Sequence, residues 1–258
     1  MKKLMCAVAA LSAGICMADI TSANIVGYQT TGTIAKGQYM ALGTVFENVA
    51  GGDIAITNLF TYSTGAAAGA ATMGTSSDQI WRWNVANAQW TKYFYYSARG
   101  KTPCWSLSTE PGVETTDTIP AGETFFFLRG GNAAVTLSLA GAVKELTGVA
   151  EFTVAKGQLA FAANPFPVSM KIADMANCYT TGTAAGAATM GTSSDQIWRW
   201  NTATSTWTKY FYYAARGKKS CWSVSTEPGV ETKDEIRAGE GFFFQRGGNA
   251  TATISLGM

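Results

Sequence analysis

The stretch DQIWRWN at residues 78–84, followed by WTKYFYY at residues 90–96, decides the fold. In the first segment Trp81 and Trp83 alternate with Ile80 and a charged residue, which is the two-residue period of a β-strand. The second segment alternates in the same way, and its aromatic residues favour strands. Together the two segments predict an antiparallel hairpin.

Both segments recur 117 residues later, at residues 195–201 and 207–213. Upstream of them the offset becomes 120, which predicts three extra residues in the first copy, near Gly51. A unit of this length can bury its own core, whereas solenoids and propellers are built from more than two repeats. We therefore predict two tandem homologous modules, at residues 24–141 and 142–258.

The rest of each copy consists of short apolar stretches between turn residues. In the first copy these stretches predict strands at residues 24–34, 38–46, 115–119, 123–129 and 133–139. A helical turn is expected at residues 54–60, with its counterpart at residues 171–176. Residues 123–129 are apolar on both faces, which predicts a central strand covered on both sides. The fold class is therefore all-β, with each module a β-sandwich or a partly open barrel.

Residues 1–23 have the composition of a secretory signal peptide. Lys2 and Lys3 precede an apolar run, and the small residues Ala18 and Ala23 mark cleavage sites. The run is shorter than the roughly 20 residues that a membrane-spanning helix needs. We expect export to the cell surface or the extracellular space, with no transmembrane segment after cleavage.

The composition excludes several classes of function. Lys and Arg number 19 against 17 Asp and Glu, so no basic surplus favours nucleic acid as a partner. The chain has no histidine, which removes the commonest general base and metal ligand. We predict no cofactor and no metal. We expect Cys104, Cys178 and Cys221 to be free thiols, with a bridge between Cys104 and Cys221 as the alternative.

Five motifs point to a known kind of sequence. They are NIVGY at residues 24–28, AKGQ at 35–38 and 155–158, ANPF at 163–166, AGEGFFF at 238–244, and DQIWRWN in both copies. Together they resemble uncharacterised secreted proteins of environmental Gram-negative bacteria, which contain one or two such modules. The resemblance extends over essentially the whole mature chain and implies an exported β-protein. It carries no active-site residues, since the group has no established activity.

All eight tryptophans lie in the repeat. Trp81 and Trp83 share one face of a strand and are expected in the core. Trp105 and Trp222 sit in segments rich in Gly, Ser and Thr, so we expect them at the surface, where an indole can stack on a sugar ring. The candidate ligand-binding residues are Trp105, Trp222, Arg99 and Arg216.

Acidic residues recur in both copies without forming a recognisable catalytic motif. A glycosidase needs two carboxyl groups about 5–10 Å apart in a cleft, and spacing along the chain does not show such a pair. Asp78 and Glu123 occupy ordinary turn positions. Arg129 is expected to support the turn that follows it or a neighbouring carboxylate.

We therefore predict a non-enzymatic structural or adhesive protein, whose partners are further copies of itself or an extracellular polysaccharide. Exposed edge strands would allow self-assembly. One alternative is a carbohydrate-binding protein that uses its loop tryptophans. A further alternative is a polysaccharide hydrolase.

Overall fold

The computed structural model describes residues 26–120, 122–143, 150–166 and 168–256. These residues form many short strands and two short 3-10 helices, and none of the described sheets closes on itself. The prediction of an all-β fold is confirmed, and the open sheets are consistent with a β-sandwich. The predicted signal peptide lies outside the described residues. We call residues 26–143 the first half and residues 150–256 the second half.

The first half is built around one five-stranded antiparallel sheet with strand order β2-β10-β6-β7-β8. Its second sheet has β11 at the centre, paired with β1 on one side and with β3 and β5 on the other. The elements are β1 (Val26–Thr30), β2 (Tyr39–Gly43), β3 (Phe46–Glu47), β4 (Ile54–Ala55), η1 (Ile56–Asn58), β5 (Thr61–Thr64), β6 (Gln79–Asn84), β7 (Gln89–Tyr96), β8 (Cys104–Leu107), β9 (Thr118–Ile119), β10 (Thr124–Leu128) and β11 (Thr136–Val143).

The second half has a five-stranded sheet of the same relative order, β13-β20-β16-β17-β18, and a smaller sheet of order β12-β21-β15. Its elements are β12 (Ala150–Val154), β13 (Leu159–Ala163), β14 (Met170–Lys171), η2 (Ile172–Asn177), β15 (Tyr179–Thr181), β16 (Gln196–Asn201), β17 (Thr206–Tyr213), β18 (Cys221–Val224), β19 (Glu235–Ile236), β20 (Gly241–Gln245) and β21 (Ala252–Leu256). The predicted module boundary between Gly141 and Ala142 falls inside β11, which continues to Val143.

Each five-stranded sheet packs one face against the smaller sheet of its own half. In the first half Ile80, Phe125 and Phe127 meet Leu137 and Leu139 of β11 in one buried cluster. The second half repeats this packing with the equivalent residues Ile197, Phe242, Phe244, Ile254 and Leu256. The alternation in the sequence is the cause, because every second residue of β6 and β10 points to the same face.

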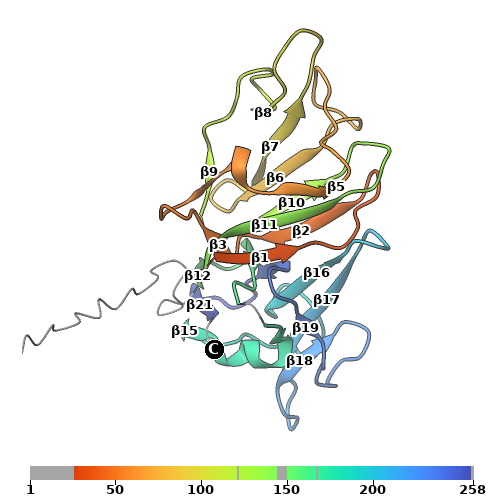
Figure 1. Cartoon of the computed structure of the whole chain (residues 1–258). Coiled ribbons are helices and arrows are strands. Elements are labelled where there is room, and N and C mark those ends of the chain that lie inside the picture. The colour runs from red at the N-terminus through yellow and green to blue at the C-terminus, as the bar shows by residue number, and fades with distance from the viewer. Residues whose placement is uncertain (1–25, 121, 144–149, 167, 257–258) are drawn as a thin grey trace, which may run out of the picture.

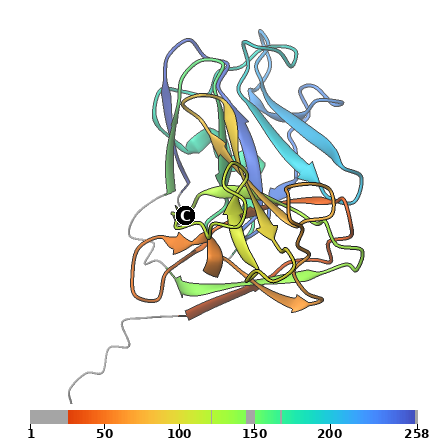
Figure 2. The same ribbon diagram turned by 90° about the horizontal axis from the view of Figure 1, so that it is seen from above.

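The other faces of the two five-stranded sheets pack against each other. A third buried cluster joins the halves through Ala41 and Phe126 of the first half and Phe161 and Phe243 of the second. The halves accordingly lie side by side in both ribbon views (Figures 1 and 2). β10 is therefore covered on both faces, as predicted, and all five of its residues are buried.

The tryptophans of the hairpin lie at this junction. We expected Trp81 and Trp83 in the core, and both pack, partly buried, against the third cluster. Ile80, on the opposite face of β6, points into the core of the first half. We call this third cluster, with the six tryptophans packed against it, the aromatic junction.

Backbone bonds at the sheet edge also link the halves. The Gly43 N–H donates to the Gly239 carbonyl at 2.8 Å. A Cβ at Gly43 would lie 2.0 Å from the Ala163 Cβ, so the close approach requires glycine here. Neither short helix in the described ranges is long and apolar enough to cross a membrane.

Candidate functional site

The two tryptophans predicted to face solvent are buried. Trp105 lies in β8 and is 6% exposed, and Trp222 lies in β18 and is 0% exposed. Trp105 packs on Tyr95 at a ring-centroid distance of 5.5 Å, and Trp222 packs on Tyr212 at 5.6 Å. The expectation that they lie in surface loops is wrong, because their short segments pair with β7 and β17 and place the indoles on the core face.

The predicted arginine partners lie elsewhere. Arg99 and Arg216 are exposed in the turns that follow β7 and β17. Among the described residues no hydrogen bond, ion pair or ring contact joins either arginine to Trp105 or Trp222. The structure therefore does not bring the four predicted residues together in one exposed site.

Asp78 and Asp195 form the most buried charged centres of the described chain. Asp78 is 0% exposed, and its Oδ2 accepts hydrogen bonds from Arg129 Nη1 at 2.6 Å and the Tyr62 hydroxyl at 2.7 Å. Its Oδ1 accepts from the Gly130 N–H at 2.8 Å. Burial and the Asp78 charge together raise the pKa of Tyr62. The expectation that Arg129 supports a carboxylate is confirmed.

The Asp195 site repeats this arrangement. Its Oδ2 accepts from Arg246 Nη1 at 2.6 Å and from the Tyr179 hydroxyl at 2.6 Å. A buried ion pair is stable only when further hydrogen bonds satisfy its remaining groups, and these partners provide them. The RGGN motif is explained by crowding, because a Cβ at Gly130 would lie 2.3 Å from the Ser77 backbone.

The aromatic junction carries two matching hydrogen bonds. Trp83 Nε1 donates to the Leu159 carbonyl at 2.9 Å, and Trp200 Nε1 donates to the Tyr39 carbonyl at 2.8 Å. Each bond runs from one half to the equivalent strand of the other half, so the contact is reciprocal. Phe161 stacks on Phe243 at a centroid distance of 4.4 Å in the middle of the junction.

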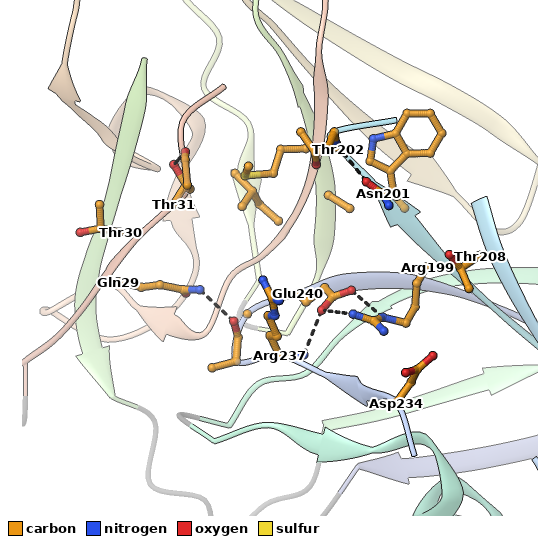
Figure 3. Close-up of a pocket in the computed structure, with 18 of the residues that line it drawn as sticks. Gln29, Thr30, Thr31, Arg199, Asn201, Thr202, Thr208, Asp234, Arg237 and Glu240 are labelled. Atoms are coloured by element: carbon orange, nitrogen blue, oxygen red, sulfur yellow. Dashed lines mark hydrogen bonds and ion pairs between the residues drawn. The ribbon is translucent and has the colours of Figure 1, made fainter. Parts of the chain in front are cut away.

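A cleft of about 610 Å³ opens beside the junction, and both halves line it. Gln29, Thr30 and Thr31 of the first half lie on one side, and Arg199 and Asn201 of the second half lie on the other (Figure 3). The volume is within the range of roughly 300–1,000 Å³ typical of small-molecule sites. This cleft is the candidate functional site.

The floor of the cleft holds a connected polar network. Arg199 makes a bidentate ion pair with Glu240, with Nε to Oε1 at 2.7 Å and Nη2 to Oε2 at 3.0 Å. Arg199 Nη1 also donates to the Tyr210 hydroxyl at 3.4 Å, and that hydroxyl donates to Asp234 Oδ2 at 2.5 Å. Burial, together with the Asp234 hydrogen bond, raises the pKa of Tyr210 to about 12.

The first half contains a counterpart of this cleft, of about 530 Å³. Arg82 pairs with Glu123 at 2.6 Å, and the Tyr93 hydroxyl donates to Asp117 Oδ2 at 2.6 Å. Within the described ranges, residues of the first half alone line this second cleft. The ion pair and the tyrosine–aspartate bond of the cleft beside Arg199 are thus repeated in the first half.

The described residues bring no metal-binding group and no cysteine to this cleft. The described residues contain no group of three or more Cys, Asp or Glu arranged to hold a metal ion. Cys104, Cys178 and Cys221 are free thiols, and Cys221 is buried. Burial, followed by the charge of Asp174, raises the pKa of Cys178.

Sequence reasoning missed the cleft residues, although a signal for them was present. Arg82 and Arg199 recur in the middle of an aromatic strand, and Glu123 and Glu240 recur before an apolar strand. A positive and a negative residue that recur together in neighbouring segments indicate an ion pair. The wall formed by Gln29 carries no such signal, because it arises from the contact between the halves.

Comparison with known proteins leaves the family open. No protein-family model, no curated protein and no solved structure matches the chain.

Proposed function

We propose that this protein is a non-enzymatic structural or adhesive protein that is exported and acts at the cell surface or in the extracellular space. The observation that carries the proposal is the use of its repeated aromatic and charged side chains in internal contacts. Six of the eight tryptophans pack at the aromatic junction, and the other two pack in the cores. A chain held together in this way can present its outer surfaces to partners.

The Glu240 carboxylate of the cleft supports a role without catalysis. Both Glu240 oxygens accept hydrogen bonds from Arg199, and Glu240 Oε2 also accepts from the Arg237 N–H at 3.0 Å. A glycosidase needs one carboxyl group free to donate a proton and another free to attack or to activate water. A carboxylate held in a bidentate ion pair with arginine is poorly suited to either task.

Carbohydrate binding is the second candidate, and the cleft between the halves favours it. Polar side chains from both halves converge on a hollow of small-molecule size. The buried Trp105 and Trp222 do not favour it, since an indole without exposed surface cannot stack on a sugar.

The proposal is tested on the purified mature protein. Sedimentation and electron microscopy should show ordered assemblies, or surface-binding assays should show saturable attachment to producing cells. Dispersed monomers that attach to nothing would contradict a structural or adhesive role. Incubation with mixed polysaccharides should leave their chain lengths unchanged, and shortened products would contradict a non-enzymatic role.

Export is tested separately, by cell fractionation and by the mass of the mature chain. We expect cleavage after Ala18 or Ala23. A full-length chain retained in the cytoplasm would contradict the proposed location.

A further inference from the structure

We infer that the cleft between the halves binds a neutral oligosaccharide, one per chain. The inference gives a ligand class to the adhesive role and rests on the proposed function in that respect. The site consists of side chains from β1 and β2 of the first half and from β16, β17 and the segment before β20 of the second. A binding site between two packed units is a common location for small ligands.

The charges that line the cleft balance. Arg199 and Arg237 contribute two cations, and Asp234 and Glu240 contribute two carboxylates. Charged partners are selected by complementary potential, and a lining with no net charge offers none. The other lining residues are uncharged, with Thr, Asn and Gln side chains among them. Such a lining suits a ligand with many hydroxyl groups and no charge.

The floor network keeps hydrogen-bonding capacity for a ligand. Arg199 has five N–H donors, and two bond Glu240 while a third is directed at Tyr210. Asp234 Oδ1 accepts no hydrogen bond from a described residue, whereas its Oδ2 is used by Tyr210. Paired sugar hydroxyls fit a guanidinium donor next to a carboxylate acceptor, since each hydroxyl both donates and accepts.

The walls add polar and apolar contacts. The Asn201 side-chain oxygen accepts from the Ala203 N–H at 3.0 Å, and its amide nitrogen donates to no described residue. Across the cleft, Gln29 Nε2 donates to the Ala238 carbonyl at 2.9 Å, while Gln29 Oε1 is buried without a partner among the described residues. Trp200 also lines the cleft, and an indole next to polar groups suits the C–H faces of a sugar ring.

The counterpart cleft in the first half explains the expected stoichiometry of one. It has the same Arg82–Glu123 pair and the same Tyr93–Asp117 pair. Pro120 stands where the second half has Arg237, so its lining carries one cation against two carboxylates. It should therefore bind neutral oligosaccharides much more weakly.

The test is calorimetric titration of the full mature chain with defined trisaccharides. The neutral probes are cellotriose, xylotriose, mannotriose, laminaritriose, maltotriose and chitotriose, and trigalacturonic acid is the charged probe. We expect at least one neutral probe to bind saturably with a stoichiometry of one. Asp234→Asn, which removes the charged acceptor, should weaken that binding about tenfold or more.

Matched variants separate binding from folding. Asp117→Asn makes the same change in the counterpart cleft and should leave the affinity within about twofold. Gln29→Ala, on the wall across the halves, should weaken binding while the near-UV circular dichroism stays unchanged. Thermal unfolding of each variant checks that the fold is intact.

Several results would overturn the inference. They are no saturable binding of any neutral probe, preference for the charged probe, two sites per chain, or equal losses in Asp117→Asn and Asp234→Asn. Failure here leaves the structural proposal standing if the protein still assembles or attaches to cells. Conversely, a probe that binds in the cleft and is cut would retain the saccharide site and contradict the non-enzymatic function.

Discussion

The two halves of the chain keep their charged networks the same but differ in one aromatic ring of their cores. Asp78 and Asp195 have the same arginine, tyrosine and glycine partners, within 0.1 Å for the bonds from arginine and from tyrosine. One aromatic ring of each core, by contrast, comes from a different place in the sequence. Hydrogen-bonded charges therefore tolerate little change, whereas apolar volume is supplied wherever the chain allows.

Phe60 and Phe152 show this difference most clearly. Phe60 packs against Phe127 at a centroid distance of 5.4 Å, and Phe152 packs against the equivalent Phe244 at 5.7 Å. The two residues are not equivalents. Asn177 stands at the place of Phe60 in the second half. Phe152 lies opposite Ile254 of β21, and in the first half Thr31, which has no ring, bonds the equivalent Leu137. Each core thus has one such ring, carried by a different segment.

The largest loss of stability is expected at the feature that both halves share, the buried aspartates. Asp78→Ala leaves the Arg129 side chain, 3% exposed, as an unpaired buried charge, and Asp195→Ala does the same to Arg246. Each change should lower the free energy of unfolding by about 3–5 kcal/mol, as measured by urea denaturation. The two losses should be similar.

A second change serves as the control for the aspartates. Adding Arg129→Met to Asp78→Ala removes both charges and should recover part of the stability, because no buried ion is then left unpaired. A loss below about 1 kcal/mol for either aspartate would mean that its network does not hold the fold.

The next largest loss of stability is expected where the two halves differ, at the core rings of Phe60 and Phe152. Phe60→Ala should destabilise the protein by roughly 2–4 kcal/mol, since it opens a cavity against Phe127. Phe152→Ala, the matching change in the second half, should cost a similar amount, since it opens a cavity against Phe244. Urea denaturation measures both losses.

The two losses decide whether both rings fill their cores. Asn177→Ala, at the exposed position that corresponds to Phe60 in the second half, is the control and should cost less than about 0.5 kcal/mol. If Phe60→Ala or Phe152→Ala is as mild as this control, that ring does not fill its core and the comparison fails.

Alkaline pH should lower the stability of both halves, because each contains one of two equivalent buried tyrosines, Tyr93 and Tyr210. Burial, followed by the aspartate hydrogen bonds, raises the pKa of Tyr93 and of Tyr210 to about 12, from an ordinary value of 10.0. Because the folded state holds these protons more tightly, their stabilisation is complete below about pH 10 and is lost as the pH rises to about 12. The loss should be roughly 2 kcal/mol for each tyrosine.

Urea denaturation at pH 8, 9, 10 and 11 measures this dependence. Tyr93→Phe with Tyr210→Phe should make the curve less steep above pH 10, since phenylalanine has no proton to lose. The curve should keep a slope, because burial also raises the pKa of Tyr62 and of Tyr179. Stability that stays constant or rises between pH 10 and pH 11 would show that the hydroxyl–aspartate bonds do not favour the protonated form.

The sequence predicts where the strands lie better than it predicts which faces of the sheets pack together. Alternation identified the hairpin of β6 and β7, and the double apolar face identified β10 as central. The same alternation could not tell the core of a half from the junction, because Trp81 and Ile80 are both apolar and lie on opposite faces. Trp105 was misplaced for a related reason, since its Gly, Ser and Thr neighbours indicated a loop where β8 pairs with β7.

The candidate site was harder to predict, because one wall of the cleft forms only where the two halves pack together. Recurrent Arg199 and Glu240 could have been paired from the sequence alone. Gln29 could not, because it lies in β1 of the first half and reaches the Ala238 carbonyl only through the contact between the halves. No local pattern encodes a contact between residues more than 200 positions apart.

The smallest effect is expected at the two indole hydrogen bonds across the junction. Trp83→Phe and Trp200→Phe keep an aromatic ring but remove the donor to the Leu159 or Tyr39 carbonyl. Each change should cost roughly 1 kcal/mol in urea denaturation. Trp200 also packs edge-on against Tyr39 at a centroid distance of 6.3 Å, whereas Leu159 stands at the place of Tyr39 opposite Trp83. The loss should therefore be slightly larger for Trp200. Equal losses would mean that this ring contact adds nothing, and no loss in either variant would mean that packing alone joins the halves.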